Sequence, residues 1–335
     1  MKTNFDFTLK GADWWKPFLG FWVLFLVIYV LDMMMSIGGA SRVGHFGVYL
    51  LLLFVFMLLL LIIQAIFTIV FLRIMLPKLS IGGKSFSFRG DIGKYLGMNV
   101  VGLLLSLVTL TIYVPWYARR ITAYLISETT FDGVSPAFLG KGGKLFKYFL
   151  LGLWIPVIVL CVIIAVALGI GIARGGAAAS SANSQLSASL VTFLTMIVIF
   201  IIIVPFMYLM YKWYANIRWN DVAIAWQTSF WPSCGFILGQ MLLTVITAGI
   251  YWPAALLRMA RYFAAKTVFS KGDAEIGRLG FEGDIGRGFG LLWGQTLLSI
   301  ITLGIYIPWA TANIGRWLAA ATIFDSKELS AEHSV

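Results

Sequence analysis

The sequence predicts an all-α polytopic membrane protein built from about five repeated helical hairpins. Three observations predict this class: the composition, a set of long apolar segments and an internal repeat. Of the 335 residues, 60% are hydrophobic and 12% are charged, and the mean hydropathy is +0.92. Soluble domains carry about 25% charged residues. The composition therefore excludes a soluble enzyme, a disordered chain and a secreted disulfide scaffold.

Seven apolar segments approach or exceed the roughly 20 residues that a helix needs to cross a bilayer. They cover residues 18–35, 48–72, 96–116, 148–173, 190–211, 237–255 and 289–309. Hydropathy alone predicts seven membrane helices. The repeat and the placement of the charges favour a larger number.

The internal repeat is carried by three segments that align without a gap on Pro115, Pro253 and Pro308. All three have Gly eighteen residues before the Pro, Thr six before it, Ile three before it and Tyr two before it. The shared residues are Gly97, Gly235 and Gly290; Thr109, Thr247 and Thr302; and Tyr113, Tyr251 and Tyr306. Apolar composition by itself would not keep these residue types in step, so one structural unit is used three times.

Two further units begin at weaker traces of the same pattern, Phe5-Asp-Phe7 and Phe138-Leu-Gly140. We therefore expect residues 1–335 to form a single membrane domain with internal repeats. The expected repeats are approximately 1–84, 85–133, 134–218, 219–272 and 279–326. Between units, segments such as 84–91 alternate polar and apolar residues around glycines, which predicts short extended segments at the membrane surface.

The charges distinguish two paths through the membrane. If seven helices cross in alternation, Lys and Arg show only a weak bias between the two faces. If every unit starts and ends on one face, that face receives all of the 25 Lys and Arg except Arg42 and Arg174. Cytoplasmic loops are enriched in Lys and Arg. The charges thus favour hairpins, with up to about ten membrane helices and both termini in the cytoplasm; the seven-helix path is the alternative.

Each Pro-centred hairpin needs a break between its two helices. In the last unit we expect a helix over 286–302, a break at 304–308 and a return helix over 309–324. Gly tolerates the backbone of a turn, and Pro begins a helix well. We expect the recurrent threonines to bond to a backbone carbonyl near the break, and Gln240 and Gln295 to bond between helices. Whether the return helices cross the bilayer or lie in its interface is open.

Small and aromatic residues recur at fixed places in these units. Gly286, Gly290 and Gly294 fall on one helix face, which predicts close packing of helices there; a substrate path along this face is the alternative. The aromatic residues beside the prolines predict an interfacial belt, with ligand stacking as the alternative. They are Tyr113, Trp116, Tyr251, Trp252, Tyr306 and Trp309.

Five arginines follow the prolines by four to eight residues and are the candidate substrate or lipid contacts. They are Arg119, Arg120, Arg258, Arg261 and Arg316. In the hairpin path some lie at membrane depth, where a charge is costly and usually functional. Together they would form a basic pocket for an anionic lipid headgroup or an anionic solute. The alternative is snorkelling toward lipid phosphates without a further function.

The sequence offers no catalytic, cofactor or metal site. It has two histidines, His45 and His333, and two distant cysteines, Cys161 and Cys234, so no metal-ligand spacing exists. Residues 280–286 are rich in Gly but lack the lysine of a phosphate loop. We expect no enzyme. The net charge of +11 is expected to face anionic lipid headgroups rather than nucleic acid.

The Phe-x-Gly segments, the element Thr302-Leu-Gly-Ile-Tyr-Ile-Pro-Trp309 and the aromatic and basic helix after it resemble the YjgN-like family. The resemblance is clear over 86–133 and 281–325 and faint elsewhere. It is altered over 219–272, where Ala248 and Ala254 replace Leu and Trp. It implies a multi-pass protein of the bacterial inner membrane, with a domain of unknown function and no assigned site residue.

Two classes of function fit these observations. The first is a transporter or channel-like protein for an anionic or lipidic solute, since repeated helical units are common in transporters. The second is a non-transporting membrane scaffold, partner-binding protein or lipid-interacting envelope protein. The sequence lacks pairs of acidic residues within its apolar segments, which argues against a proton-coupled carrier. Protein partners and the oligomeric state are left open.

Overall fold

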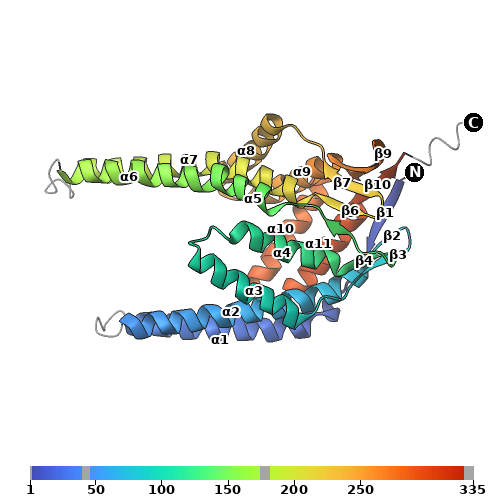
Figure 1. The fold of residues 1–335 in the computed structure, drawn as a ribbon, viewed down its shortest axis with the longest axis horizontal. Helices are drawn as coiled ribbons and strands as arrows, with labels where there is room; N and C mark the ends of the chain where they lie inside the picture. The colour runs from blue at the N-terminus through green and yellow to red at the C-terminus, as the bar shows by residue number, and fades with distance from the viewer. Residues whose placement is uncertain (1, 40–45, 174–181, 328–335) are drawn as a thin grey trace, which may run out of the picture.

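A computed structural model describes residues 2–39, 46–173 and 182–327 of the chain (Figure 1). Helices form most of this chain, but ten strands join in one sheet whose neighbouring strands are antiparallel. The predicted all-α class is therefore wrong, and the protein has a mixed α and β structure. The short extended segments expected between the repeats are strands, and they pair with one another in this sheet.

The described chain passes five times through one order of elements: a strand, a pair of helices and a second strand. The first unit contains β1 (Lys2–Phe7), α1 (Trp15–Gly39), α2 (Phe46–Met75) and β2 (Leu79–Ile81), with short turns η1 (Gly11–Asp13) and η3 (Leu76–Lys78). The second contains β3 (Lys84–Phe88), α3 (Ile92–Val108), α4 (Val114–Ser127) and β4 (Thr129–Phe131). The third contains β5 (Ala137–Phe138), α5 (Gly142–Phe149), the π-helical η4 (Leu150–Trp154), α6 (Ile155–Ala173), α7 (Ala182–Tyr214) and β6 (Ile217–Trp219). The fourth contains β7 (Val222–Trp226), α8 (Phe230–Ile246), α9 (Trp252–Ala265) and β8 (Thr267–Lys271). The fifth contains β9 (Ala274–Phe281), α10 (Ile285–Ile301), α11 (Ile307–Ala321) and β10 (Thr322–Ser326).

The strands pair in the order β4-β3-β2-β1-β10-β9-β8-β7-β6-β5. The pairing of β1 with β10 places Thr3 opposite Phe324 and so brings the two ends of the described chain together. Strands of consecutive units are joined by tight turns, for example at Gly82 and Gly83, whose φ angles are positive. The edge strands β4 and β5 follow one another in the chain, and the sheet is curled.

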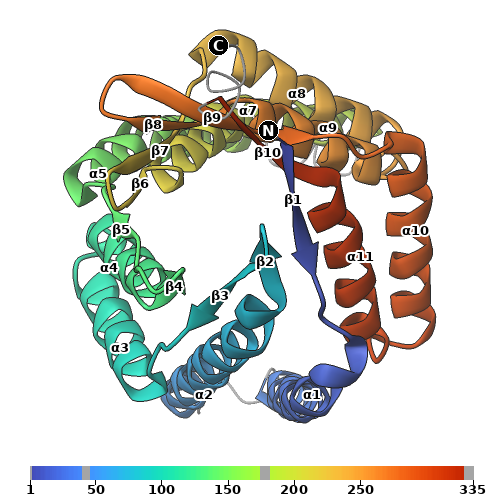
Figure 2. The same cartoon turned by 90° about the vertical axis from the view of Figure 1, so that its right-hand side faces the viewer.

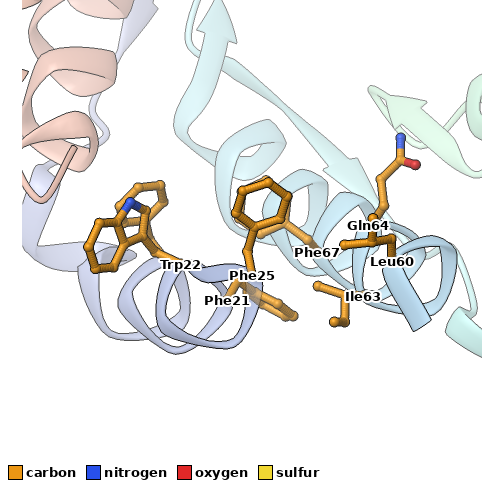
Figure 3. Close-up of a pocket in the computed structure, with 8 residues that line it drawn as sticks. Phe21, Trp22, Phe25, Leu60, Ile63, Gln64 and Phe67 are labelled. Atoms are coloured by element: carbon orange, nitrogen blue, oxygen red, sulfur yellow. The ribbon is translucent and has the colours of Figure 1, made fainter. Parts of the chain in front are cut away.

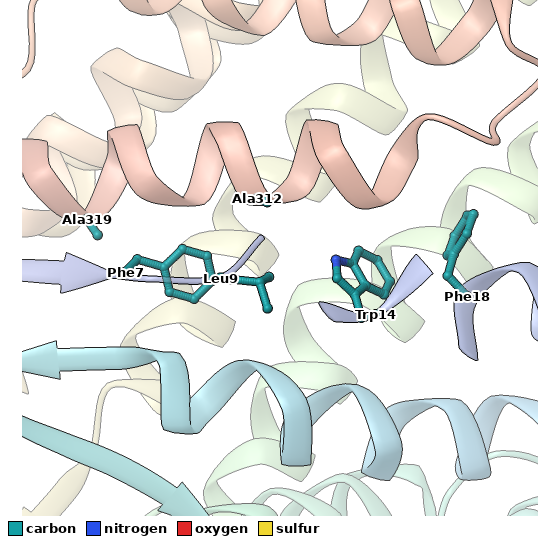
Figure 4. Packing of buried hydrophobic residues seen from close by; sticks show 6 residues of the cluster. All are labelled: Phe7, Leu9, Trp14, Phe18, Ala312 and Ala319. Carbon is teal, nitrogen blue, oxygen red and sulfur yellow. The ribbon is translucent and has the colours of Figure 1, made fainter. Parts of the chain in front are cut away.

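The five helix pairs are arranged around a ring at one end of this sheet (Figure 2). Each pair contacts the next: α2 packs on α3, α4 on α5, α7 on α8, α9 on α10, and α11 on α1. The buried side chains lie mainly at these junctions. Figure 4 shows the junction of the fifth and first units, with buried Phe7, Leu9, Trp14, Phe18, Ala312 and Ala319. Small residues on α11 thus leave room for the aromatic side chains of the first unit.

The three Pro-centred units are helical hairpins whose shared threonines build the turn. Thr302 Oγ1 donates to the carbonyl of Leu298 at 2.8 Å and accepts from the backbone N–H of Tyr306 at 3.1 Å. Thr109 and Thr247 make the same two bonds in their own hairpins. The predicted bond from these threonines to a backbone carbonyl is confirmed. Together with the bond from the backbone N–H four residues later, it explains why Thr recurs at this position.

The second residue after each of these threonines has a positive φ angle. It is Gly249 and Gly304 in two hairpins, each with φ of 88°, but Thr111 in the third, with φ of 71°. Its N–H donates to the carbonyl five residues earlier, at 2.6–2.7 Å, and so caps the end of the first helix. The proline then lies at the start of the return helix, where no N–H is needed.

Two described helices, Leu51–Lys78 and Gly142–Val166, are long and apolar enough to cross a membrane. Shorter apolar helices cover Trp15–Leu31, Ile92–Val108, Ile201–Tyr214 and Phe230–Ile246. The expected number of up to ten membrane helices is therefore not supported in the described chain. The physical reason is length, because all six helices of the Pro-centred hairpins have only 14–17 residues. The helix pairs α1–α2 and α6–α7 extend far beyond the three short hairpins (Figure 1).

Candidate functional site

Two of the five candidate arginines join consecutive units. Arg119 Nε donates to the carbonyl of Gly140 at 3.1 Å, and Arg261 Nη2 donates to the carbonyl of Gly283 at 2.7 Å. Arg73, at the end of α2, donates to Gly90 through Nε and Nη2 at 3.1 and 2.6 Å. Each bond runs from the second helix of one unit to the segment between strand and helix of the next. We call Arg73, Arg119 and Arg261 the junction arginines.

The other three candidate arginines lie on exposed helix positions. The guanidinium of Arg258 lies 5.5 Å from the centre of the Tyr251 ring. Arg316 Nη2 donates to Asn313 Oδ1 at 2.6 Å, and Arg120 is exposed. The five arginines thus lie on α4, α9 and α11, and their contacts are made within a unit or to the next unit.

The tryptophans after two of the prolines also pack between units. A Cβ atom on Gly142 would clash with the Trp116 ring, and one on Gly11 would clash with Trp309. Each glycine occupies the fourth position after a Phe that ends a strand, so the same contact occurs at two junctions. In the fourth unit the tryptophan is replaced by Ala254. The packing explains these tryptophans without a ligand; the aromatic belt stays a prediction.

The expected packing of helices across the glycine face is wrong. A Cβ atom added to Gly97, Gly235, Gly239, Gly290 or Gly294 would meet nothing within 4 Å. The close approaches occur instead at two glycines on other faces of the same helices: Gly102 lies against Tyr117, and Gly288 lies against Trp317 and Leu257. Sequence spacing identified a common helix face but could not show which face meets a neighbour.

The expected bonds of Gln240 and Gln295 between helices are confirmed. Tyr251 on the turn side of α9 donates its hydroxyl to Gln240 Oε1 at 2.9 Å, and Asn313 of α11 donates to Gln295 Oε1 at 3.0 Å. Each bond ties the two helices of one hairpin within an apolar segment, where a polar group needs a partner.

A basic pocket lies where the third and fourth units meet. Its volume is about 630 Å³, and it is lined by Lys212, Trp226, Gln227, Thr228, Ser229, Pro232, Tyr262 and Lys266. We call it the junction pocket. Lys212 Nζ lies 3.4 Å from both the Tyr208 hydroxyl and the Thr228 carbonyl, which are long bonds for an ammonium group. Among the described residues, neither Lys212 nor Lys266 forms an ion pair with a carboxylate.

The junction pocket also contains the N-terminus of α8, which has no acidic cap. Asp91 and Asp284 cap the equivalent helices α3 and α10, because each accepts a backbone N–H at 2.7 Å. The equivalent residue before α8 is Ser229, whose side chain makes no capping bond. Only the N–H groups of Phe230 and Trp231 are therefore available to an anion in the first three positions of α8, because the third residue, Pro232, has no N–H.

Sequence analysis missed the junction pocket, although a comparison of the aligned units would have found it. Ser229 takes the place of Asp91 and Asp284 at the start of the first helix. Lys266 takes the place of Glu128, since both end the return helix thirteen residues after the proline. Both changes make this junction more positive than its equivalent in the second unit.

Two further clefts lie between helices. The first, about 440 Å³, lies between α1 and α2 (Figure 3) and is lined by Phe18, Phe21, Trp22, Phe25, Leu60, Ile63, Gln64 and Phe67. The second, about 420 Å³, lies between α10 and α11 and includes Gln295, Thr296, Ser299 and Thr311. The aromatic and aliphatic lining of the first suits hydrocarbon rather than a polar solute.

Among residues 2–39, 46–173 and 182–327, no three His, Cys, Asp or Glu side chains lie together as metal ligands. Cys161 is exposed, Cys234 is buried, and both are free thiols. His45, His333, Arg42 and Arg174 lie outside the described residues. Burial raises the pKa of the Cys234 thiol, which keeps it protonated rather than reactive.

Together, the fold and the junctions define a ring of five strand–helix–helix–strand units with apolar helices and one basic junction pocket. The chain matches the family described as "Bacterial protein of unknown function (DUF898)" over residues 84–159, 148–275 and 277–330. It belongs to this family, and its resemblance to the YjgN-like proteins is thereby confirmed. No curated protein and no solved structure matches the chain.

Proposed function

We propose that this protein is a lipid-interacting protein of the bacterial inner membrane that inserts its three short hairpins into one leaflet. The observation that carries the proposal is the exposure of large apolar side chains at the hairpin tips. Leu110, Ile246 and Leu303 are 84%, 77% and 77% exposed. Keeping such side chains in water rather than in an apolar environment costs about 1.5–3 kcal/mol each. Apolar tips of this kind favour insertion into lipid.

The two long helix pairs supply the membrane anchor in this proposal. Helix α2 has 30 residues and α7 has 33, so they are about 45 and 50 Å long and exceed the hydrocarbon core of about 30 Å. The most apolar parts of Leu51–Lys78 and Gly142–Val166 are 11% and 0% buried. The core helix of a soluble protein would be largely buried. These helices instead present their apolar side chains outward.

The short hairpins are long enough to enter the bilayer but not to cross it. Helix α3 has 17 residues and α4 has 14, which gives lengths of about 25 and 21 Å. Their ends at the sheet carry polar and charged groups, including Asp91 and Lys94. Each hairpin leaves the sheet and returns to it, so all three tips lie away from the strands. The tips would therefore reach the hydrocarbon of the nearer leaflet.

The placement of charge suggests that the sheet lies on the cytoplasmic side, with both termini. The ends of the described chain are paired in β1 and β10, so they lie on the same side. Arg73, Lys212 and Lys266 lie at the sheet ends of their helices, Arg261 lies in the sheet-side half of α9, and Arg119 lies near the middle of α4. Basic residues concentrate on the cytoplasmic side of inner-membrane proteins, and they would face the anionic headgroups of that leaflet.

A transporter or channel-like protein for an anionic or lipidic solute is the second proposal, with less support. A set of arginines at membrane depth would favour it. The junction arginines donate to backbone carbonyls of the next unit, and this bonding gives them a role in assembling the ring. A lipid-interacting protein that does not transport needs no pathway through the bilayer.

The proposal is tested by the depth of the hairpin tips. In a variant lacking Cys161 and Cys234, a single cysteine at Leu303 carries a nitroxide, and the protein is placed in bilayers. We expect collisions with dissolved oxygen and protection from a water-soluble nickel chelate. A cysteine at the exposed Ser135, on the sheet side, serves as the control and should show the reverse. Reaction of the Leu303→Cys thiol with an impermeant maleimide from the periplasmic side would contradict the proposal.

A further inference from the structure

We propose that the junction pocket binds a phosphate group, and that its ligand is the phosphate of an anionic phospholipid headgroup. This inference deepens the proposed function and rests on the sheet end of the ring lying at headgroup level. Four features of the pocket carry it: the lysine pair, the open end of α8, an unpartnered indole N–H and an exposed tryptophan at the rim.

The lysine pair supplies positive charge that no described carboxylate neutralises. Lys212 comes from the end of α7 and Lys266 from the end of α9, so two helices of different units place their charges in one pocket. Lys212 reaches its protein acceptors only at 3.4 Å. An anion in the pocket would offer both ammonium groups shorter, charge-assisted hydrogen bonds.

The N-terminus of α8 adds backbone donors to this charge. The helix has 17 residues, and its first turn contains no acidic side chain. Ser229, at the cap position, is exposed and contributes a hydroxyl. Phosphate is a favoured ligand of such helix ends, because the N–H groups and the helix dipole both stabilise negative charge.

The indole of Trp226 is an unsatisfied donor in the wall of the junction pocket. Trp226 lines the pocket and is 5% exposed, yet its Nε1–H has no hydrogen-bond partner among the described residues. A buried donor without a partner costs about 1–3 kcal/mol, so such groups are rare in native proteins. A phosphate oxygen would accept from this N–H after a small movement of the indole, because the Nε1 atom is itself buried.

The rim of the pocket favours a lipid over a free anion. Trp231, in the first turn of α8, is 80% exposed. Tryptophan is enriched at the level of the headgroups, where its ring meets both hydrocarbon and water. The adjacent end of α7 carries exposed Tyr211, whose ring lies 5.2 Å from that of Phe263 on α9. A phosphate bound in the pocket would therefore lie beside an aromatic rim that fits the headgroup region.

The test measures retention of phosphatidic acid by the full chain in native mass spectrometry, with inorganic phosphate as a separate ligand. We expect the wild type to retain the lipid. The variant Lys212→Gln/Lys266→Gln should bind it at least about tenfold more weakly, because two charge-assisted hydrogen bonds are lost. The variant Lys84→Gln/Lys94→Gln removes the same charge from the second unit and should bind as the wild type does.

A second variant separates loss of binding from loss of folding. Ser229 is exposed, so Ser229→Asp should keep the fold while its carboxylate repels the phosphate. It cannot copy the cap bonds of Asp91 and Asp284, because the third residue of α8 is Pro232. Equal lipid retention by the wild type, Ser229→Asp and the double lysine variant would overturn the inference. Binding of inorganic phosphate that depends on these residues, with no dependence for the lipid, would support the phosphate site and overturn the lipid as its source. Since this experiment needs no membrane topology, its outcome is independent of the depth measurement at Leu303.

Discussion

The second and fourth units have the same succession of elements but differ in charge at the junction that each forms with the preceding unit. In the second unit, Arg73 donates to Gly90 at 2.6 Å and Asp91 caps α3. In the fourth, Lys212 lies 3.4 Å from Thr228 and Ser229 leaves α8 uncapped. The same arrangement of strands and helices thus forms one junction whose polar groups bond to each other and another that is an open basic pocket. A repeated unit can acquire a binding site by losing the groups that satisfy its own polar atoms.

Within this comparison, the largest change in stability is expected when the cations at the two junctions are replaced. Arg73→Ala should lower the free energy of unfolding by about 1.5–3 kcal/mol, because a charged donor to a partly buried carbonyl is lost. Lys212→Ala should cost clearly less, since its bonds are long. Chemical unfolding in detergent micelles checks both values. Equal losses would show that the two junctions are held in the same way.

Substitutions in the hairpin turns of the second and fourth units should give the next largest change in stability. Gly249→Thr places a β-branched residue at a φ of 88° and should destabilise the fourth unit by about 1–2 kcal/mol. Thr111→Gly in the second unit relieves the corresponding strain and should raise stability by up to about 1 kcal/mol. Melting temperatures of the two variants should therefore move in opposite directions. A fall in both would mean that the Thr111 side chain contributes more to the turn than its backbone strain costs.

The helix caps should show a smaller, reciprocal effect. Asp91→Ala removes the cap of α3 and should lower stability by about 1 kcal/mol. Ser229→Asp should add only about 0.3 kcal/mol to the fourth unit through the helix dipole, because Pro232 offers no N–H for a cap bond. Denaturant midpoints compare the two, with Asp284→Ala as the matched control in the fifth unit. A gain from Ser229→Asp as large as the loss from Asp91→Ala would contradict this difference between the two caps.

The smallest change in stability is expected for an ion pair that lies outside both junctions. Hydrogen bonds from Arg278 and then Lys327 lower the pKa of Glu275 to about 2. A lowered pKa in the folded state stabilises the protein above the ordinary pKa of about 4.3, and this contribution is lost as the pH falls toward 2. Because the carboxylate is exposed, the change should be slight. Glu275→Gln should make the melting temperature less dependent on pH between about pH 6 and pH 3, and an unchanged dependence would contradict this assignment.

Local chemistry made the hairpin turns predictable. The bonds of Thr302 and the return helix after Pro308 involve residues within a few positions of each other, so a repeated pattern of Thr, Gly, Tyr and Pro indicates them. The bonds of Gln240 and Gln295 were predictable for a related reason, because an amide in an apolar helix needs a partner nearby. The resemblance to the YjgN-like family rests on the same local elements.

The sheet and the junctions could not be predicted in this way. Strands such as Ala137–Phe138 are too short to give a strong pattern, and the pairing of β1 with β10 joins opposite ends of the sequence. The all-α prediction failed because the apolar helices dominate the composition. The glycine face was assigned to packing because spacing places residues on one face without showing what that face meets.

The sequence by itself determined the helical hairpins, their turns and the apolar character of the protein, since these depend on composition and on contacts within a few residues. Only the tertiary structure decided that the strands form one curled sheet, that Arg73, Arg119 and Arg261 bond to the next unit, and that Lys212 and Lys266 share a pocket. These features arise from contacts between units, and their energies depend on which side chains the fold brings together. The same repeated unit therefore forms a hydrogen-bonded junction in one place and a basic pocket in another, and the side chains of the neighbouring unit decide which of the two forms.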